Sequence, residues 1–139
     1  MGTYHSQIHL QSKGNTDIID ITDEASRHVA KSALRTGTCT LFCAGSTASV
    51  MTIEYEDGLL KDFPDAMERI APQGAVYEHH LRWGDGNGHS HVRASVIGPS
   101  LTIPFVNGRL TLGTWQQVAF VDFDIRPRSR TIEVLILGE

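Results

Sequence analysis

In the first half of the chain, hydrophobic positions alternate in some segments and recur at helical spacing in others. Residues 3–11 alternate imperfectly, and residues 16–21 follow a Gly-Asn pair, which predicts two strands joined by a turn. A helix is expected to start at Thr22, a good capping residue, and to end before Gly37. The rest of this half predicts a buried strand at 38–43, a second strand at 50–56 and a helical stretch over 59–70 that restarts at Pro64.

From residue 91 onward, the pattern predicts almost only strands. The centre of this region is a hairpin, because Asn107-Gly108 is the pair that a two-residue type I′ turn prefers, and pairing outward places Phe105 opposite Leu110. We therefore expect an α+β fold, a single domain over residues 1–139 with a mostly antiparallel β-sheet and two or three helices packed on one side. The strands expected here are 91–98, 100–106, 109–115, 117–124 and 131–138.

Composition narrows the class of protein. The chain has 139 residues, a formal net charge of −4 and no apolar run of the ~20 residues that a membrane span requires. An acidic balance speaks against nucleic-acid binding, and the first residues lack the pattern of a signal peptide. We expect a cytoplasmic protein with no nucleic-acid or membrane partner, in which Cys39 and Cys43 are buried free thiols, too far apart along one strand for a disulfide.

The segment 77–95 carries the strongest chemical signal, with four of the seven histidines beside a Gly-rich turn. If residues 89–91 begin a strand, His89 and His91 share a face and can converge on one ion, with His79 or His80 arriving from the preceding strand. Neutral imidazoles bind metals, and protonated ones bind anions. Asn87 can offer a hydrogen bond to a ligand there, whereas a loop of solvated histidines is the simpler interpretation.

Two further stretches could bind an anion. The segment 44–50 supplies Ser46 and Thr47 with unhindered backbone amides, but it lacks the pattern of a serine nucleophile. Near the C-terminus, Arg128 and Arg130 would share a face of an extended segment, and paired guanidinium groups suit a phosphate or carboxylate. Surface solvation or an intersubunit salt bridge explains the two arginines equally well.

Three more residues are candidates for catalysis or substrate binding, and each also has a simpler structural explanation. Glu54 could serve as a metal ligand or general base, although a solvated strand end is the simpler interpretation. Trp115 could stack on a planar ring of the substrate, with the Gln116 amide forming hydrogen bonds to the polar edge of that ring. Alternatively, Trp115 could be a core residue.

Taken in order, several short motifs resemble the YjbQ-like family of secondary thiamine-phosphate synthases and uncharacterised proteins. The motifs are STASV with Glu54 downstream, Tyr77-x-His79, DGNGHSH, IGPS, GRLTLGTWQ and PRSR. The resemblance implies an α+β fold, a homotrimer packed through its sheets, and a pocket in which histidines hold a divalent metal such as zinc or magnesium. The ligand positions correspond to His79 and His91; a third histidine of the family corresponds to Gly45 here, so His89 would have to replace it.

The leading hypothesis is an enzyme that acts on phosphorylated substrates, similar to the thiamine-phosphate synthase-like transferase activity of the family. Such a reaction needs charge stabilisation of a departing diphosphate, which a divalent ion and arginines supply. Glu54, His79 and His91 would be catalytic, and the substrate would contact Ser46, Thr47, Asn87, Trp115, Gln116, Arg128 and Arg130. The alternatives are a non-catalytic trimer that binds a metal or small anion, and a metal-dependent hydrolase that uses Glu54.

Overall fold

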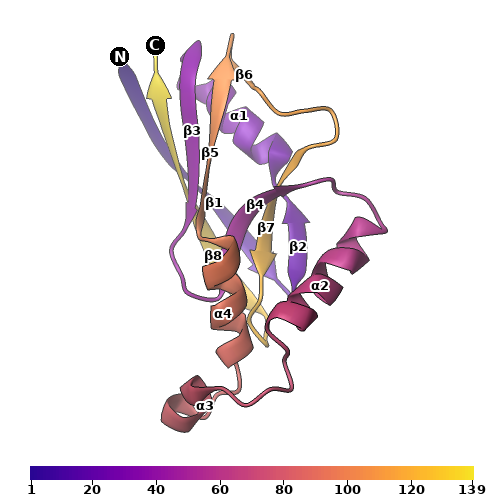
Figure 1. Ribbon diagram of the computed structural model, residues 1–139. Coiled ribbons are helices and arrows are strands. Elements are labelled where there is room, and N and C mark those ends of the chain that lie inside the picture. The colour runs from indigo at the N-terminus through magenta and orange to yellow at the C-terminus, as the bar shows by residue number, and fades with distance from the viewer.

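The computed structural model describes all residues from 1 to 139 and contains eight strands and four helices (Figure 1). The N- and C-termini lie beside each other at one end, because the first and last strands pair along their whole length. In chain order the elements are β1 (Gly2–Ser12), β2 (Asp17–Asp20), α1 (Thr22–Ser32), β3 (Thr36–Cys43), β4 (Ala48–Ile53), α2 (Leu59–Ile70), α3 (Glu78–Trp83), α4 (Gly88–Ile97), β5 (Ser100–Val106), β6 (Arg109–Leu110), β7 (Gln117–Asp122) and β8 (Arg128–Gly138).

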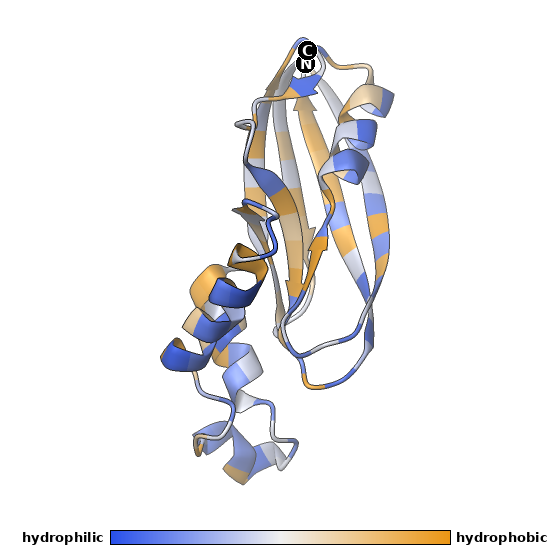
Figure 2. Ribbon diagram, turned by 90° about the vertical axis from the view of Figure 1, so that its right-hand side faces the viewer, coloured by the Kyte–Doolittle hydropathy of each residue, from blue (hydrophilic) through white to orange (hydrophobic).

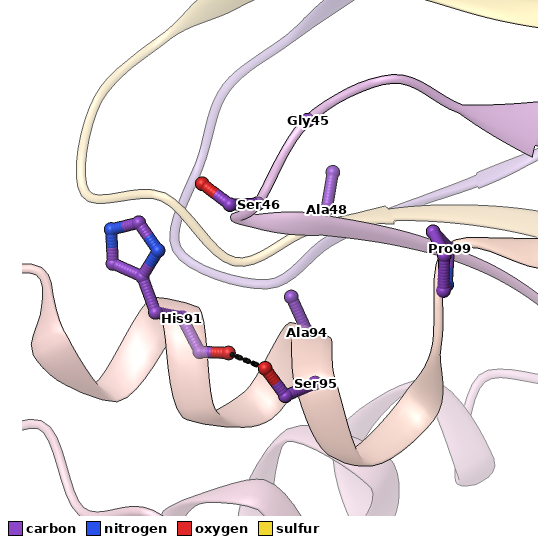
Figure 3. A pocket seen from close by; sticks show the side chains of 7 residues that line it. All are labelled: Gly45, Ser46, Ala48, His91, Ala94, Ser95 and Pro99. Atoms are coloured by element: carbon purple, nitrogen blue, oxygen red, sulfur yellow. Dashed lines mark hydrogen bonds between the residues drawn. The ribbon is translucent and has the colours of Figure 1, made fainter.

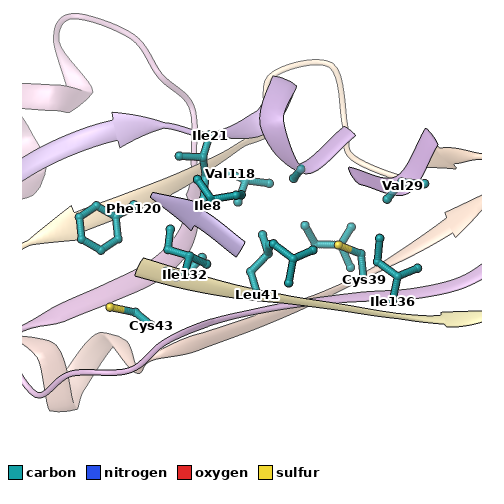
Figure 4. Close-up of a cluster of buried hydrophobic side chains, with 14 of the residues drawn as sticks. Ile8, Ile21, Val29, Cys39, Leu41, Cys43, Val118, Phe120, Ile132 and Ile136 are labelled. Atoms are coloured by element: carbon teal, nitrogen blue, oxygen red, sulfur yellow. The ribbon is translucent and has the colours of Figure 1, made fainter. Parts of the chain in front are cut away.

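The strands form two antiparallel sheets rather than one. The larger sheet has the order β1-β8-β3-β5-β6, and the smaller one has the order β2-β7-β4. Alternation along β8 explains the packing, since Ile132, Val134 and Ile136 are buried while Leu135 and Leu137 face outward. The inner face of the larger sheet therefore packs against the smaller sheet and α1, where Phe120 and Val29 complete the main core (Figure 4).

The other face of the smaller sheet is covered by α2 and α4. Val121 and Phe123 pack there against Met67 of α2 and Ala94 of α4, and the Ser49 hydroxyl of β4 donates to the Ala94 carbonyl at 3.2 Å. Figure 2 shows these helices and α3 gathered at the opposite end from the termini, with α1 set apart from them. This arrangement places α4 directly beside the loop that leads into β4.

The predicted fold class is confirmed: the protein is α+β with mostly antiparallel sheets, and it has four helices. The Asn107-Gly108 turn is also confirmed, with φ of 53° and 72°, and Phe105 pairs with Leu110. Beyond Leu110 the expected strand 109–115 ends, because residues 111–116 leave the sheet as a loop. A hairpin turn fixes the register of its neighbours, but it does not fix the length of the strands.

The prediction of a strand over 91–98 is wrong, since these residues belong to α4. The buried positions Gly88, His89, Ser90, Arg93 and Ala94 recur at helical spacing, and that period outweighs the β-branched valines at the exposed positions. The break expected at Pro64 is also wrong. α2 runs through it, beginning after Glu56, whose carboxylate accepts the N–H groups of residues 58 and 59.

Cys39 and Cys43 are free and buried, as predicted. Burial raises the pKa of the Cys39 thiol to about 11, which keeps it protonated at neutral pH. None of the four helices is long and apolar enough to cross a membrane.

Candidate active site

Two buried carboxylates and two arginines form a network where β7 ends and β8 begins. The Arg130 guanidinium donates two hydrogen bonds to Asp122, from Nε to Oδ2 at 2.8 Å and from NH2 to Oδ1 at 3.0 Å. Arg128 contacts Asp124 Oδ2 through Nε at 2.8 Å and NH2 at 2.7 Å. Arg128 and Arg130 lie two residues apart at the start of β8, so the strand period places both side chains on one face.

The loop before β4 is fastened to this network through Thr47. The Thr47 hydroxyl accepts from Arg130 NH2 at 2.7 Å and donates to Asp124 Oδ2 at 3.3 Å, while its carbonyl accepts the Phe123 N–H at 2.9 Å. The network is therefore a rigid floor beneath residues 44–47. In each arginine, only NH1 is left without a hydrogen-bond acceptor in the chain.

The surroundings of Asp124 and Arg130 favour the charged form of each side chain. Burial works to raise the pKa of Asp124, but hydrogen bonds from the Ile125 N–H, Asn87 and Arg128 outweigh it and hold the pKa below its usual value. The hydrogen bond to Asp122 raises the pKa of Arg130. Asp124 and Arg130 are thus ionised at neutral pH, and each forms an ion pair within the network.

Two imidazoles stack next to this network. The rings of His79 on α3 and His91 on α4 have centroids 4.4 Å apart and planes inclined at 38°. Burial, together with the nearby His79, lowers the pKa of His91, so that His91 is neutral at neutral pH and can accept a proton. His79 Nδ1 lies 3.3 Å from Asp85 Oδ1 but makes no aligned hydrogen bond within the chain.

A cavity of about 190 Å³ opens between the 44–47 loop and α4. In Figure 3 the Ser46 hydroxyl and the His91 ring lie at the same end of it, and the Ser95 hydroxyl donates to the His91 carbonyl. The backbone N–H groups of Gly45 and Ser46 have no acceptor in the chain. A Cβ placed on Gly45 would come within 3.2 Å of Arg130 NH1, so that this guanidinium nitrogen lies at the margin of the cavity.

Comparison with known proteins decides the family. The family model described as UPF0047 protein YjbQ-like matches residues 6–139. The chain belongs to the YjbQ-like UPF0047 family. A UPF0047 protein of Methanothermobacter thermautotrophicus is 35% identical over the full chain and 95% of its own length, and UPF0047 protein YugU of Bacillus subtilis is 31% identical over 94% and 97%. The crystal structure of a YbjQ-like protein from Sulfolobus solfataricus superposes with a TM-score of 0.94 at 33% identity, covering 99% of each chain.

The residues present do not fit the three-histidine metal site expected for the YjbQ-like family. His89 and His91 lie two residues apart on a helix, and therefore on nearly opposite faces, whereas a strand would have placed them together. His89 is 2% exposed and packs near Tyr77, with ring centroids 6.4 Å apart. No three His, Cys, Asp or Glu side chains converge in this chain, and Gly45 adds no ligand.

Glu54, Trp115 and Gln116 lie away from this cavity. Ala48 and Ile53 mark the two ends of β4, about 17 Å apart, and the cavity is at the Ala48 end. Glu54 and Trp115 line a separate hollow of about 540 Å³ at the far end. Trp115 is 74% exposed, so it is not a core residue. Gln116 Nε2 donates to Thr52 at 3.4 Å and Oε1 accepts from the Gly113 N–H, so that it stabilises its own turn.

The structure places several other sequence-predicted residues near one another. Ser46 and His91 line the cavity, His79 stacks on His91, and Thr47 ties the loop to the floor. Asn87 donates from Nδ2 to Asp124 Oδ1 at 3.3 Å. The sequence reasoning missed the two partner carboxylates, although Asp122 directly follows four apolar residues of β7, 118–121, which is itself a signal of a buried ion pair.

Proposed function

We propose that this protein is a small-molecule enzyme that binds the phosphate group of its substrate in the cavity between the 44–47 loop and α4. The observation that carries the proposal is the set of unused donors at that cavity. The Gly45 and Ser46 N–H groups have no acceptor, and Arg130 NH1 is held beside them by its other two nitrogens. Consecutive free amides and a fixed guanidinium are an arrangement that suits a phosphate oxygen.

The size of the cavity supports a phosphate group rather than a whole cofactor. Its volume of about 190 Å³ is below the roughly 300 Å³ at which pockets begin to enclose drug-sized ligands. The remainder of the substrate then extends outward, past the imidazole pair. This mode of binding rests on the N–H donors of Gly45, Ser46 and Arg130 rather than on a bound metal ion.

His91 supplies the chemistry in this proposal. Its lowered pKa keeps it neutral at neutral pH, and it can take a proton from a reacting hydroxyl or return one to a leaving oxygen. A thiamine-phosphate synthase-like transfer is one reaction of this kind. Within a single chain it would proceed without Trp115 as a ring platform and without Glu54 as a base, because both lie at the far end of β4.

A homotrimer is the second part of the proposal. Leu135 and Leu137 of β8 pair with residues of β3 on the outer face of the larger sheet, and Phe42 and Val106 lie on the same face. These four side chains are 41–48% exposed. An apolar set of this kind on a sheet face favours contact between copies of the chain.

Calorimetric titration of EDTA-treated protein with inorganic phosphate tests the binding site. We expect one phosphate per chain, and about tenfold weaker binding or worse in His91→Ala and in Ser46→Pro, which removes one of the free amides. Ser129→Ala, at an exposed position of β8, is the matched control and should bind as the wild type does. Unchanged affinity in His91→Ala contradicts the proposal.

Sedimentation equilibrium tests the assembly. The wild type should sediment as a trimer, and Leu135→Lys should dissociate it, whereas Leu81→Lys on α3, where the side chain is 75% exposed, should not. A wild-type chain that stays monomeric at micromolar concentration contradicts the homotrimer.

A further inference from the structure

A further hollow, which we call the second hollow, lies close to the imidazole pair and is distinct from the one lined by Glu54 and Trp115. Its volume is about 300 Å³, and its polar lining residues are Asp85, Asn87, Asp124, Arg126 and Arg128. His91 lines the phosphate cavity, and His79, stacked on His91, contacts Asp85 of this second hollow. The imidazole pair therefore links the lining of the phosphate cavity to that of the second hollow.

Asp85 and Asn87 contribute acceptors to the second hollow. Asn87 is 7% exposed, and its Nδ2 donates to the Asp124 carboxylate. That contact fixes the orientation of the amide, because a flipped amide would set oxygen against oxygen. Asn87 Oδ1 is left buried without a partner, and the carboxylate of Asp85, with 47% of the side chain exposed, also lines the hollow. A buried acceptor without a donor is costly, so a ligand that supplies an N–H is stabilised here.

Arg126 and Arg128 contribute donors to the same hollow. Arg126 is exposed and forms no ion pair in the chain. Arg128 contacts Asp124 through Nε and NH2, which leaves NH1 without a partner. Since Asp124 is neutralised by Arg128, the accessible charges of the hollow are the positive charge of Arg126 and the negative charge of Asp85.

We propose that the second hollow recognises a zwitterionic amino-acid group, so that the substrate class is a phosphorylated amino acid. The ammonium group donates to Asp85 and Asn87 Oδ1, and the carboxylate accepts from Arg126 and Arg128 NH1. The phosphate occupies the first cavity, and in that respect the inference rests on the proposed function. The second hollow alone defines the rest of the substrate.

Three related probes separate the contributions. O-phospho-L-serine carries all three groups, phosphoethanolamine lacks the carboxylate, and 3-phosphoglycerate carries a hydroxyl in place of the ammonium. Calorimetric titration of the full-length chain should give the tightest binding for O-phospho-L-serine, with each of the others weaker by about tenfold or more. Equal affinities for the three probes overturn the inference.

Variants test whether the carboxylate of the ligand binds in the second hollow. Arg126→Gln should weaken O-phospho-L-serine about tenfold and leave phosphoethanolamine unchanged, and Arg109→Gln, at another exposed arginine, should change neither. An equal loss for both probes in Arg126→Gln overturns the inference. His91→Ala should weaken all three probes alike. If it weakens none while Arg126→Gln still removes the carboxylate preference, the proposed function fails and the inference stands; no binding of any probe at millimolar concentration overturns both.

Discussion

Replacing Arg130 by Gln removes the partner of a fully buried carboxylate. Asp122 is 0% exposed and receives two bonds from Arg130, while the arginine side chain is itself only 13% exposed. Breaking one partner of a buried ion pair typically costs about 3–5 kcal/mol. The Ser12 hydroxyl and the Asp124 N–H still donate to Asp122, which places the expected loss in the free energy of unfolding near the lower end, about 3 kcal/mol.

Urea unfolding followed by circular dichroism measures this loss. Arg109→Gln, at an exposed arginine without an ion pair, is the matched control and should change the free energy of unfolding by no more than about 0.5 kcal/mol. Asp122→Asn combined with Arg130→Gln should cost less than the sum of the two single changes, because the double variant leaves no buried charge without a partner. A loss below about 1 kcal/mol in Arg130→Gln would refute the reasoning, since that is the range of an exposed salt bridge.

Three other predictions follow from single groups. The Tyr4 hydroxyl and Nδ1 of His28 share a hydrogen bond, and burial lowers the pKa of His28. The unfolded chain therefore binds the extra proton first, and the free energy of unfolding should fall as the pH drops below about 6.5, less steeply in His28→Gln. Gly37→Ala would place Cβ against the β8 backbone and should cost at least about 2 kcal/mol in urea unfolding, whereas Gly74→Ala, with open space around it, should cost less than about 0.5. Cys39, with its pKa of about 11, should resist a thiol reagent at neutral pH in the folded protein and react in urea.

Local signals in the sequence predict most of the fold. The Asn107-Gly108 turn needs only two residues with positive φ, and the face shared by Arg128 and Arg130 needs only the strand period. α4 was missed because Val92 and Val96 favour a strand locally. The helix is decided by tertiary burial of the opposite side, which no short window contains.

The candidate site was predictable only in part, for the same reason. His79 and His91 do meet, but through the packing of α3 on α4 rather than across a hairpin. His89 was misassigned because a period of two was assumed where the chain has a helical period. Glu54 is separated from the cavity by the length of β4, and only the pairing of β4 with β7 reveals which end it occupies.

The most direct test of the central claim is the pH dependence of sulfate binding to EDTA-treated protein. Sulfate remains a dianion between about pH 7.5 and pH 5.5, so that only the protein changes its charge over the range in which imidazoles titrate. Protonation of His91 adds positive charge at the cavity, and the account predicts that sulfate binds without added metal and binds more tightly as the pH falls. Binding that appears only when zinc is supplied, and that weakens as the pH falls because protons displace the metal, would contradict it.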